Sequence, residues 1–118
     1  MNELLHPRPA KELAERRRAL APDAEAAFRA FGQAVFRDGA LPRKTKELIA
    51  VAVAHVTQCP YCIRGHTRAA ARHGASAEEI MEAVWVASEM RAGAAFAHSA
   101  IALEALGDAG AHAPPDRG

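Results

Sequence analysis

The stretch LIAVAVAHVTQCPYCIRGH, residues 48–66, decides the fold because it holds a buried helix, a stop and a second helix start. Residues 48–56 are apolar on every side, which is typical of a helix covered on several faces. This helix is expected to end near Thr57 and Gln58. Cys59 and Pro60 then open the next helix, since proline is favoured at the first helical position. The stretch therefore predicts two consecutive helices joined by a tight turn.

The segments before this hairpin also follow helical spacing. Residues 9–20 predict a short, charged helix that forms an N-terminal arm. Residues 23–37 place Phe28, Phe31 and Val35 three and four positions apart, which predicts an apolar stripe on one face of a helix. We expect these three side chains to lie in the core.

The segments after the hairpin predict one more long helical stretch. Gly74 fits the C-terminal cap of the preceding helix. Ser76 and Glu79 have the spacing of a capping box, in which each side chain bonds a free backbone N–H of the other residue. A helix is expected over residues 77–106, with a break near residues 91–93.

Composition favours an all-α fold. The chain has 118 residues, a mass of 12.5 kDa and 30 alanines, which is the size of one domain. Alanine is the strongest helix former, and β-branched apolar residues are few. A core built from such small side chains buries limited area, so burial between subunits is expected to supplement it.

Charge and hydropathy exclude several partner classes. The formal net charge is only +1, which gives no electrostatic footprint for nucleic acid or for an anionic membrane. The N-terminus lacks a secretory apolar region, and no apolar stretch reaches the roughly 18 to 20 residues of a membrane span. We expect a soluble, cytoplasmic protein, in whose reducing surroundings paired cysteines are catalytic or metal-binding.

The two cysteines and a histidine share one helix face. At 100° per residue, Cys59, Cys62 and His66 lie within 60° of one another. A helix N-terminus favours a thiolate, and the thiolate is the reactive form of cysteine. If the two helices form an antiparallel hairpin, Glu47 lies at a depth close to that of His66, where a carboxylate would orient the imidazole. The pattern predicts an activated thiol with a second thiol able to close a disulfide. His55 is interpreted as a helix-capping residue outside this site.

This constellation resembles the AhpD-like branch of the carboxymuconolactone decarboxylase family. The likeness consists of Glu47, eleven intervening residues, the Cys59-Pro-Tyr-Cys62 segment, three more residues and His66. It implies an all-helical AhpD-like fold, homotrimers or homohexamers, and peroxidase or disulfide reductase activity without a metal, flavin or other cofactor. The resemblance makes Glu47, Cys59, Cys62 and His66 the catalytic residues. Some AhpD proteins have a further relay histidine where this chain has Tyr61.

The resemblance also implies a domain organisation. Residues 1–21 are expected to form the helical arm, 22–106 the family domain and 107–118 a flexible C-terminal tail. Trp85 and Phe96 are interpreted as core residues or as contacts between subunits.

In the expected mechanism, His66 assisted by Glu47 deprotonates Cys62, which attacks a hydroperoxide. Cys59 then closes the disulfide, and an external dithiol or lipoyl-type reductant reopens it. For a disulfide substrate the two cysteines exchange roles. A pKa of Cys59 below that of Cys62 would overturn this assignment.

Other hypotheses stay open. Cys59, Cys62 and His66 are three zinc ligands, and Glu47, His55 or His73 would be the fourth. Two inert cysteines in a purely structural oligomerisation module are a second alternative. Decarboxylation of a carboxymuconolactone is the least favoured function, because that branch typically lacks the cysteine pair.

Overall fold

The computed structural model of this chain describes residues 5–111, and these form helices without any strand. The helices are α1 (Lys11–Leu20), α2 (Pro22–Phe36), α3 (Arg43–Thr57), α4 (Pro60–Arg72) and α5 (Ala77–Ala111). The predicted all-α fold is confirmed. No helix in this part of the chain has the length and apolar character needed to cross a membrane.

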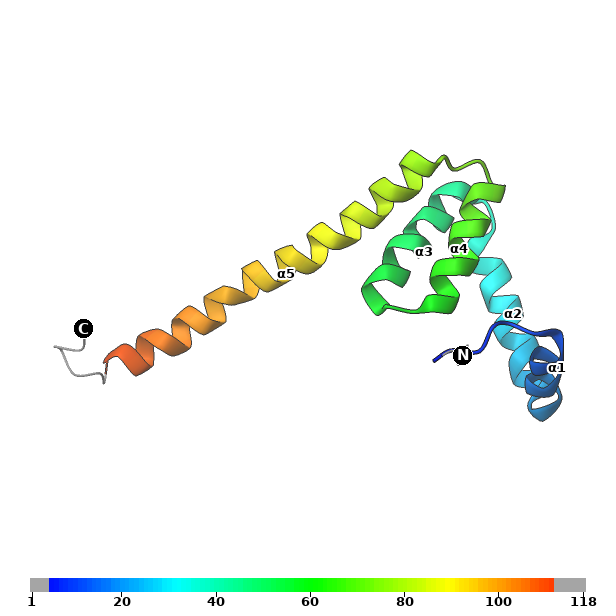
Figure 1. Cartoon of the computed structure of the whole chain (residues 1–118), viewed down its shortest axis with the longest axis horizontal. Helices are drawn as coiled ribbons and strands as arrows, with labels where there is room; N and C mark the ends of the chain where they lie inside the picture. The colour runs from blue at the N-terminus through cyan, green and yellow to red at the C-terminus, as the bar shows by residue number, and fades with distance from the viewer. Residues whose placement is uncertain (1–4, 112–118) are drawn as a thin grey trace.

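Helix α3 is the centre of the molecule and packs against both α4 and α5 (Figure 1). The buried apolar side chains are small, and four of the five are alanines: Val51, Ala54, Ala69, Ala70 and Ala87. Small side chains let the helices approach closely, but they exclude little area from water. The apolar side chains Ile49, Val53 and Val56 of α3 are exposed. The expectation that residues 48–56 are covered on several faces is therefore wrong within a single chain.

The turn between α3 and α4 has the predicted position. Gln58 adopts a left-handed conformation with φ 60°, and its backbone N–H donates to the Ala54 carbonyl oxygen. A non-glycine residue in this region costs roughly 1–2 kcal/mol. Pro60 then takes the first turn of α4. This tight turn lays α4 antiparallel to α3 and brings residues 19 positions apart into contact (Figure 1).

Side-chain hydrogen bonds fix the connection between α2 and α3. The Lys46 ammonium donates to the carbonyl oxygens of Val35 and Arg37, at 2.8 and 2.6 Å, and thereby satisfies the C-terminal end of α2. The backbone N–H of Arg43 donates to the Asp38 carboxylate at 2.6 Å, which satisfies the N-terminal end of α3. These bonds fix where the last turn of α2 lies relative to α3.

The apolar stripe of α2 is not part of a core. Phe28 is 72% exposed, Phe31 is 63% exposed and Val35 is also exposed. Within residues 5–111, the helices that contact α2 leave this stripe exposed to solvent. The expectation that these residues lie in the core is therefore wrong for the single chain, although the helix itself is where the spacing placed it.

Helix α5 begins at the predicted capping box. The Glu79 N–H donates to Ser76 Oγ at 3.0 Å, and the Ser76 N–H donates to Glu79 Oε1 at 2.9 Å. The helix then runs without interruption to Ala111. The expected break near 91–93 is wrong, because the roughly 1 kcal/mol that a glycine costs inside a helix is outweighed by the alanines around Gly93.

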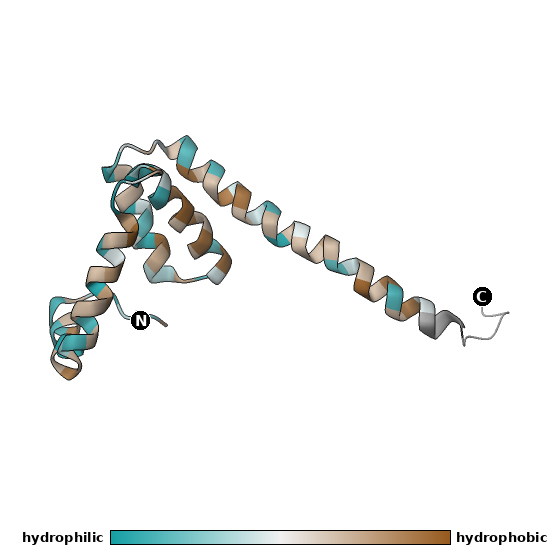
Figure 2. Cartoon of the chain, turned by 180° about the vertical axis from the view of Figure 1, so that it is seen from behind, coloured by the Kyte–Doolittle hydropathy of each residue, from teal (hydrophilic) through white to brown (hydrophobic). Residues whose placement is uncertain are grey.

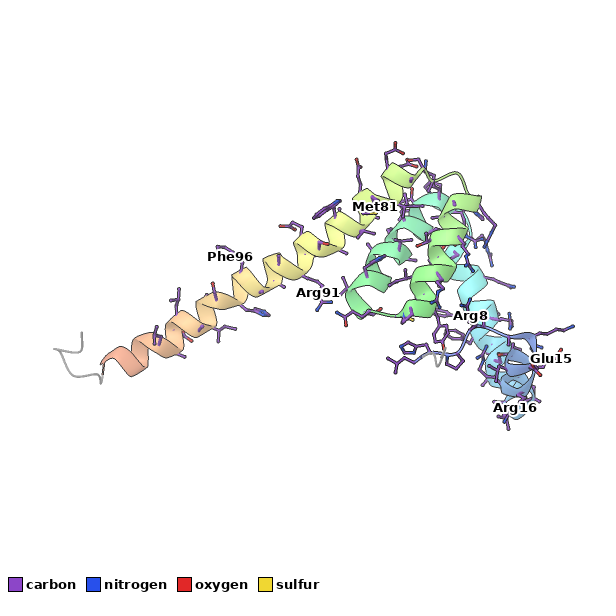
Figure 3. The ribbon with its side chains drawn as sticks, in the orientation of Figure 1. Arg8, Glu15, Arg16, Met81, Arg91 and Phe96 are labelled. Atoms are coloured by element: carbon purple, nitrogen blue, oxygen red, sulfur yellow. The ribbon has the colours of Figure 1, made fainter. Side chains whose placement is uncertain are left out.

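The second half of α5 leaves the rest of the molecule (Figures 1 and 2). The Arg91 guanidinium donates to the Val56 carbonyl oxygen at the end of α3, and beyond it α5 projects alone (Figure 3). Phe96, on this projecting part, is 80% exposed, and Trp85 is also exposed. Neither is a core residue of the single chain. The helix extends past the expected boundary at residue 106, and the end of the expected tail, residues 112–118, lies outside the described residues.

Candidate active site

Glu47 is a buried carboxylate that two basic side chains share. Its side chain is 1% exposed and lies on the α3 face that meets α4. His66 on α4 donates from Nδ1 to Glu47 Oε1 at 2.7 Å. Arg43, one turn before Glu47, donates from Nε to the other carboxylate oxygen at 2.8 Å. Both carboxylate oxygens therefore accept a charge-assisted hydrogen bond.

The environment keeps Glu47 ionised. Burial alone raises the pKa of a carboxyl group, but the hydrogen bonds from His66 and Arg43 outweigh it, so that the pKa of Glu47 lies below its usual value. An ionised Glu47 that accepts from Nδ1 leaves Nε2 of His66 as the unprotonated nitrogen of the neutral ring. This is the tautomer that a general base in the site requires.

An aromatic ring holds the imidazole from the side. Phe36, the last residue of α2, stacks on His66 with ring centroids 5.0 Å apart and planes inclined by 20°. Arg43 contacts the same phenyl ring, its guanidinium carbon 5.7 Å from the centroid. Phe36 and Arg43 therefore connect the end of α2 to the Glu47–His66 pair.

Sequence reasoning missed both of these residues. The sequence does contain a signal for Arg43, because a basic residue four positions before a glutamate on a helix can form an ion pair with it. Phe36 had none, since its contact with His66 joins residues thirty positions apart through a tertiary arrangement of helices.

The two cysteines lie at the start of α4 and differ in environment. Cys59 is the N-cap residue, and its Sγ accepts the backbone N–H of Cys62 at 3.3 Å. A hydrogen bond from the Cys62 thiol, together with the backbone N–H groups of Cys62 and Tyr61, lowers the pKa of Cys59. The same thiol contact, with Cys62 as donor, and burial raise the pKa of Cys62. These directions favour a thiolate on Cys59 over one on Cys62, whereas the sequence analysis expected Cys62 to be the attacking thiolate.

Cys62 and His66 line an open cleft together with Glu47. The cleft has a volume of about 730 Å³ and is lined chiefly by residues of α2, α3 and α4. Tyr61 is also at its edge, and its hydroxyl donates to the Pro7 carbonyl oxygen at 2.8 Å. Tyr61 therefore binds the segment that precedes α1. It stands at the position where some AhpD proteins have a relay histidine.

The histidines considered as further zinc ligands lie elsewhere. His55 donates from Nδ1 to the Val51 carbonyl oxygen at 2.8 Å, within its own helix. His73 is the C-cap residue of α4, at the opposite end from the cysteines. Within residues 5–111, no three histidine, cysteine or acidic side chains gather closely enough to hold a metal ion. The zinc hypothesis receives no support from the geometry.

Comparison with known proteins gives the family. The sequence profile of the carboxymuconolactone decarboxylase family matches residues 22–105. The chain belongs to this family. The resemblance seen in the sequence is thereby confirmed at the family level, and the AhpD-like assignment is consistent with it.

Relatives of the family have the same fold and size. The chain is 56% identical over 106 residues to protein 4 of the cox locus of Paracoccus denitrificans, covering 90% of this chain and 95% of that one. A family protein from Legionella pneumophila has a crystal structure with TM-score 0.65 and 37% identity, covering 82% of this chain and 87% of that one. A Thermotoga maritima family protein described as having a possible part in the antioxidative response is 32% identical, with TM-score 0.52, covering 69% and 93%.

Proposed function

We propose that this family member is a thiol-dependent oxidoreductase that reduces hydroperoxides or disulfides through Cys59 and Cys62. The observation that carries the proposal is the buried Glu47–His66 pair, 2.7 Å between Nδ1 and Oε1, in the same cleft as Cys62. A dithiol at a helix N-terminus beside an oriented base has what thiol chemistry needs. The description of the Thermotoga maritima relative as having a possible part in the antioxidative response agrees with it.

The first step belongs to Cys59. Its thiolate attacks the terminal oxygen of a hydroperoxide, so that an S–O bond forms and the O–O bond breaks. The alkoxide that leaves takes a proton from water and becomes an alcohol. The lowered pKa of Cys59 supports this order, because more of the thiol is then ionised at neutral pH.

The second step uses Cys62 and His66. The imidazole takes the Cys62 proton, and the new thiolate attacks the sulfenic sulfur of Cys59. The S–S bond forms as the S–O bond breaks, and the leaving hydroxide takes the proton from His66 and becomes water. Glu47 stabilises the imidazolium in between.

The disulfide is then reduced from outside. An external dithiol or lipoyl-type reductant supplies two electrons and two protons and is itself oxidised to a disulfide. Such reductants belong to a reducing compartment, so a cytoplasmic location is part of this proposal. For a disulfide substrate, Cys59 attacks one sulfur and forms a mixed disulfide, which Cys62 resolves.

Self-association as a homotrimer or homohexamer completes the proposal. The projecting part of α5 carries exposed apolar side chains, Phe96 and Ile101 among them, that find no cover within the described chain. Another copy of the chain offers the same small-residue helices, so it is the occupant that we propose for this face.

The test combines thiol titration with intact mass. In Cys62→Ser the serine keeps a hydrogen-bond donor beside Cys59, and we expect Cys59 to titrate at lower pH than Cys62 does in Cys59→Ser. One equivalent of an organic hydroperoxide should remove two hydrogens from the parent chain and leave a sulfenic acid in Cys62→Ser. His66→Ala should slow disulfide closure by about a hundredfold or more.

Two results would contradict the proposal. If neither cysteine reacts faster than a free thiol, the redox function fails. If Cys62 titrates at the lower pH, the order of the two cysteines is reversed.

A further inference from the structure

The cleft beside the dithiol is a groove between one face of α2 and one face of α4. Its α4 wall runs from Cys62 to Arg72, ten residues or about 15 Å along the helix axis. Gly32 on α2 and Gly65 on α4 leave the groove open, because a Cβ at either position would meet nothing within 4 Å. The groove is therefore long, with Cys62 at one end and Cys59 one helical turn before it at the start of α4.

The groove walls combine apolar and positively charged side chains. Phe28 and Phe36 of α2 and Ala69 of α4 supply apolar surface. The charged residues along it are four arginines and two glutamates: Arg17, Arg29, Arg43, Arg72, Glu25 and Glu47. With His66 neutral, this leaves an excess of two positive charges.

The two carboxylates are already occupied by ion pairs. Glu47 is shared by Arg43 and His66, as described above. Glu25 lies 3.5 Å from Arg17, 2.9 Å from Arg18 and 3.7 Å from Arg29. No ion pair joins Arg72 to a carboxylate within the described part of the chain. A positive charge without a partner thus stands at the end of the groove farthest from the cysteines.

We infer that the groove binds a carboxylate on an apolar chain, with the carboxylate at Arg72 and the reacting group at the dithiol end. An arginine fork matches a carboxylate in geometry and charge, and the phenyl rings cover the apolar chain. The statement that the bound molecule carries a reacting group rests on the proposed function. The statement that it is a carboxylate on an apolar chain rests on the groove alone. A ten-carbon chain matches the distance from Arg72 to Cys62.

The binding test uses decanoate, with decanol as the uncharged control, in titration calorimetry at low ionic strength. We expect decanoate to bind more tightly than decanol and to weaken as salt is added. Arg72→Gln should weaken decanoate binding about fivefold, the size of a partly exposed charge contact, and leave decanol unchanged. Arg64→Gln is the matched control, because Arg64 is an exposed arginine of α4 that does not line the groove.

The inference is overturned if decanol binds as tightly as decanoate, or if the Arg64 and Arg72 variants lose affinity equally.

A kinetic experiment distinguishes failure of this inference from failure of the proposed function. A ten-carbon hydroperoxide with a free carboxylate should have a higher kcat/KM than its methyl ester, and Arg72→Gln should remove the difference. If decanoate binds but neither hydroperoxide is reduced, the proposed function is contradicted and the ligand class is retained. If the acid and its methyl ester are reduced equally well, the ligand class is contradicted.

Discussion

Glu47 has the most constrained environment of the site, because a fully buried carboxylate is stable only while both of its hydrogen-bond partners are present. Removing one member of such a buried group leaves an uncompensated charge, which costs more than a surface ion pair ever contributes. The same residue therefore serves the fold and the chemistry. Its substitution should be visible in both stability and rate.

We expect Glu47→Gln to lower stability at neutral pH by about 1–2 kcal/mol, less than for a fully buried ion pair, because the side chains of Arg43 and His66 are 39% and 32% exposed. The pKa of Glu47 is lowered in the folded chain, so its ionised form stabilises the fold above the unfolded value near 4.5. That contribution is lost as the pH falls through the folded value. Urea unfolding at pH 7 and at pH 3 should show the difference between variant and parent narrowing in acid. An equal difference at both pH values would contradict the prediction.

Arg43 is predicted to set the pH above which Glu47 is ionised and orients His66. Arg43→Gln removes one of the hydrogen bonds that lower the pKa of Glu47, so Glu47 should become protonated at a higher pH than in the parent chain. The acid limb of the disulfide-closure rate should then move to higher pH, with the rate recovered in alkaline buffer. Stopped-flow measurement of closure across pH 5–9 checks this.

The control for that experiment is the neighbouring Lys44→Gln, since Lys44 pairs with Glu79 at 2.9 Å instead of with the site. Arg43→Lys keeps the charge and should restore most of the parent profile. If the profile of Arg43→Gln superposes on that of the parent chain, Arg43 acts in packing alone.

At the scale of elements, the α3–α4 hairpin holds the four site residues, and it is also the part that sequence could predict. Gln58 and Pro60 mark a turn through local backbone chemistry, and helical spacing alone puts both cysteines and His66 on one face. The contact between Glu47 and His66 followed from counting depths on either side of that turn. These are short-range regularities, so pattern analysis captures them.

The features that the sequence could not predict depend on how the helices pack against one another. The position of Phe36 over His66 depends on the α2–α3 connection and its lysine and aspartate bonds. Phe28 has the spacing of a core residue, yet spacing does not say whether the covering helix belongs to the same chain. The lowered pKa of Cys59, on which the proposed order of the cysteines rests, comes from hydrogen bonds donated by the Cys62 thiol and backbone, and no spacing specifies these.

The start of α5 gives a prediction at this scale. Ser76→Ala removes the capping bond to Glu79 and should lower the free energy of unfolding by about 1 kcal/mol. Ser88→Ala is the control, because the Ser88 hydroxyl bonds only the Val84 carbonyl oxygen within the helix and alanine is the better helix former. Urea unfolding of the two variants should show a loss in the first alone. A loss in both would point to a role of the hydroxyls outside capping.

At the scale of the whole molecule, the described chain is more extended than a globular chain of the same length. Its radius of gyration is 21.6 Å and its longest extent 67 Å, whereas a globular chain of this length has a radius of gyration near ~13.5 Å. Figure 2 shows hydrophobic residues along α5 where the helix has no neighbour. Contiguous exposed apolar surface of this kind commonly marks a site of protein–protein interaction.

Phe96→Glu is therefore predicted to weaken self-association. The parent chain should sediment as a multiple of 12.5 kDa, and the variant should shift toward the single-chain mass. His98→Glu, two positions on and near the opposite face of the helix, is the control. Fluorescence of the exposed Trp85 should shift to shorter wavelength with concentration in the parent chain. A parent chain that sediments at 12.5 kDa at all concentrations would contradict the prediction.

Cys59 and Cys62 are only three positions apart, and this limits how much disulfide closure in the proposed redox cycle can change the stability of the fold. A crosslink between residues three apart closes the shortest kind of ring and removes little freedom from the unfolded chain. The chain-entropy relation gives about 2 kcal/mol for a loop of four residues, against nearly 5 kcal/mol for a loop of ~100. Oxidation and reduction thus change the global stability far less than a structural crosslink would. In the proposed redox cycle, closing this disulfide should raise the melting temperature by roughly 6–12 °C, less than half of the shift expected from a crosslink over ~100 residues.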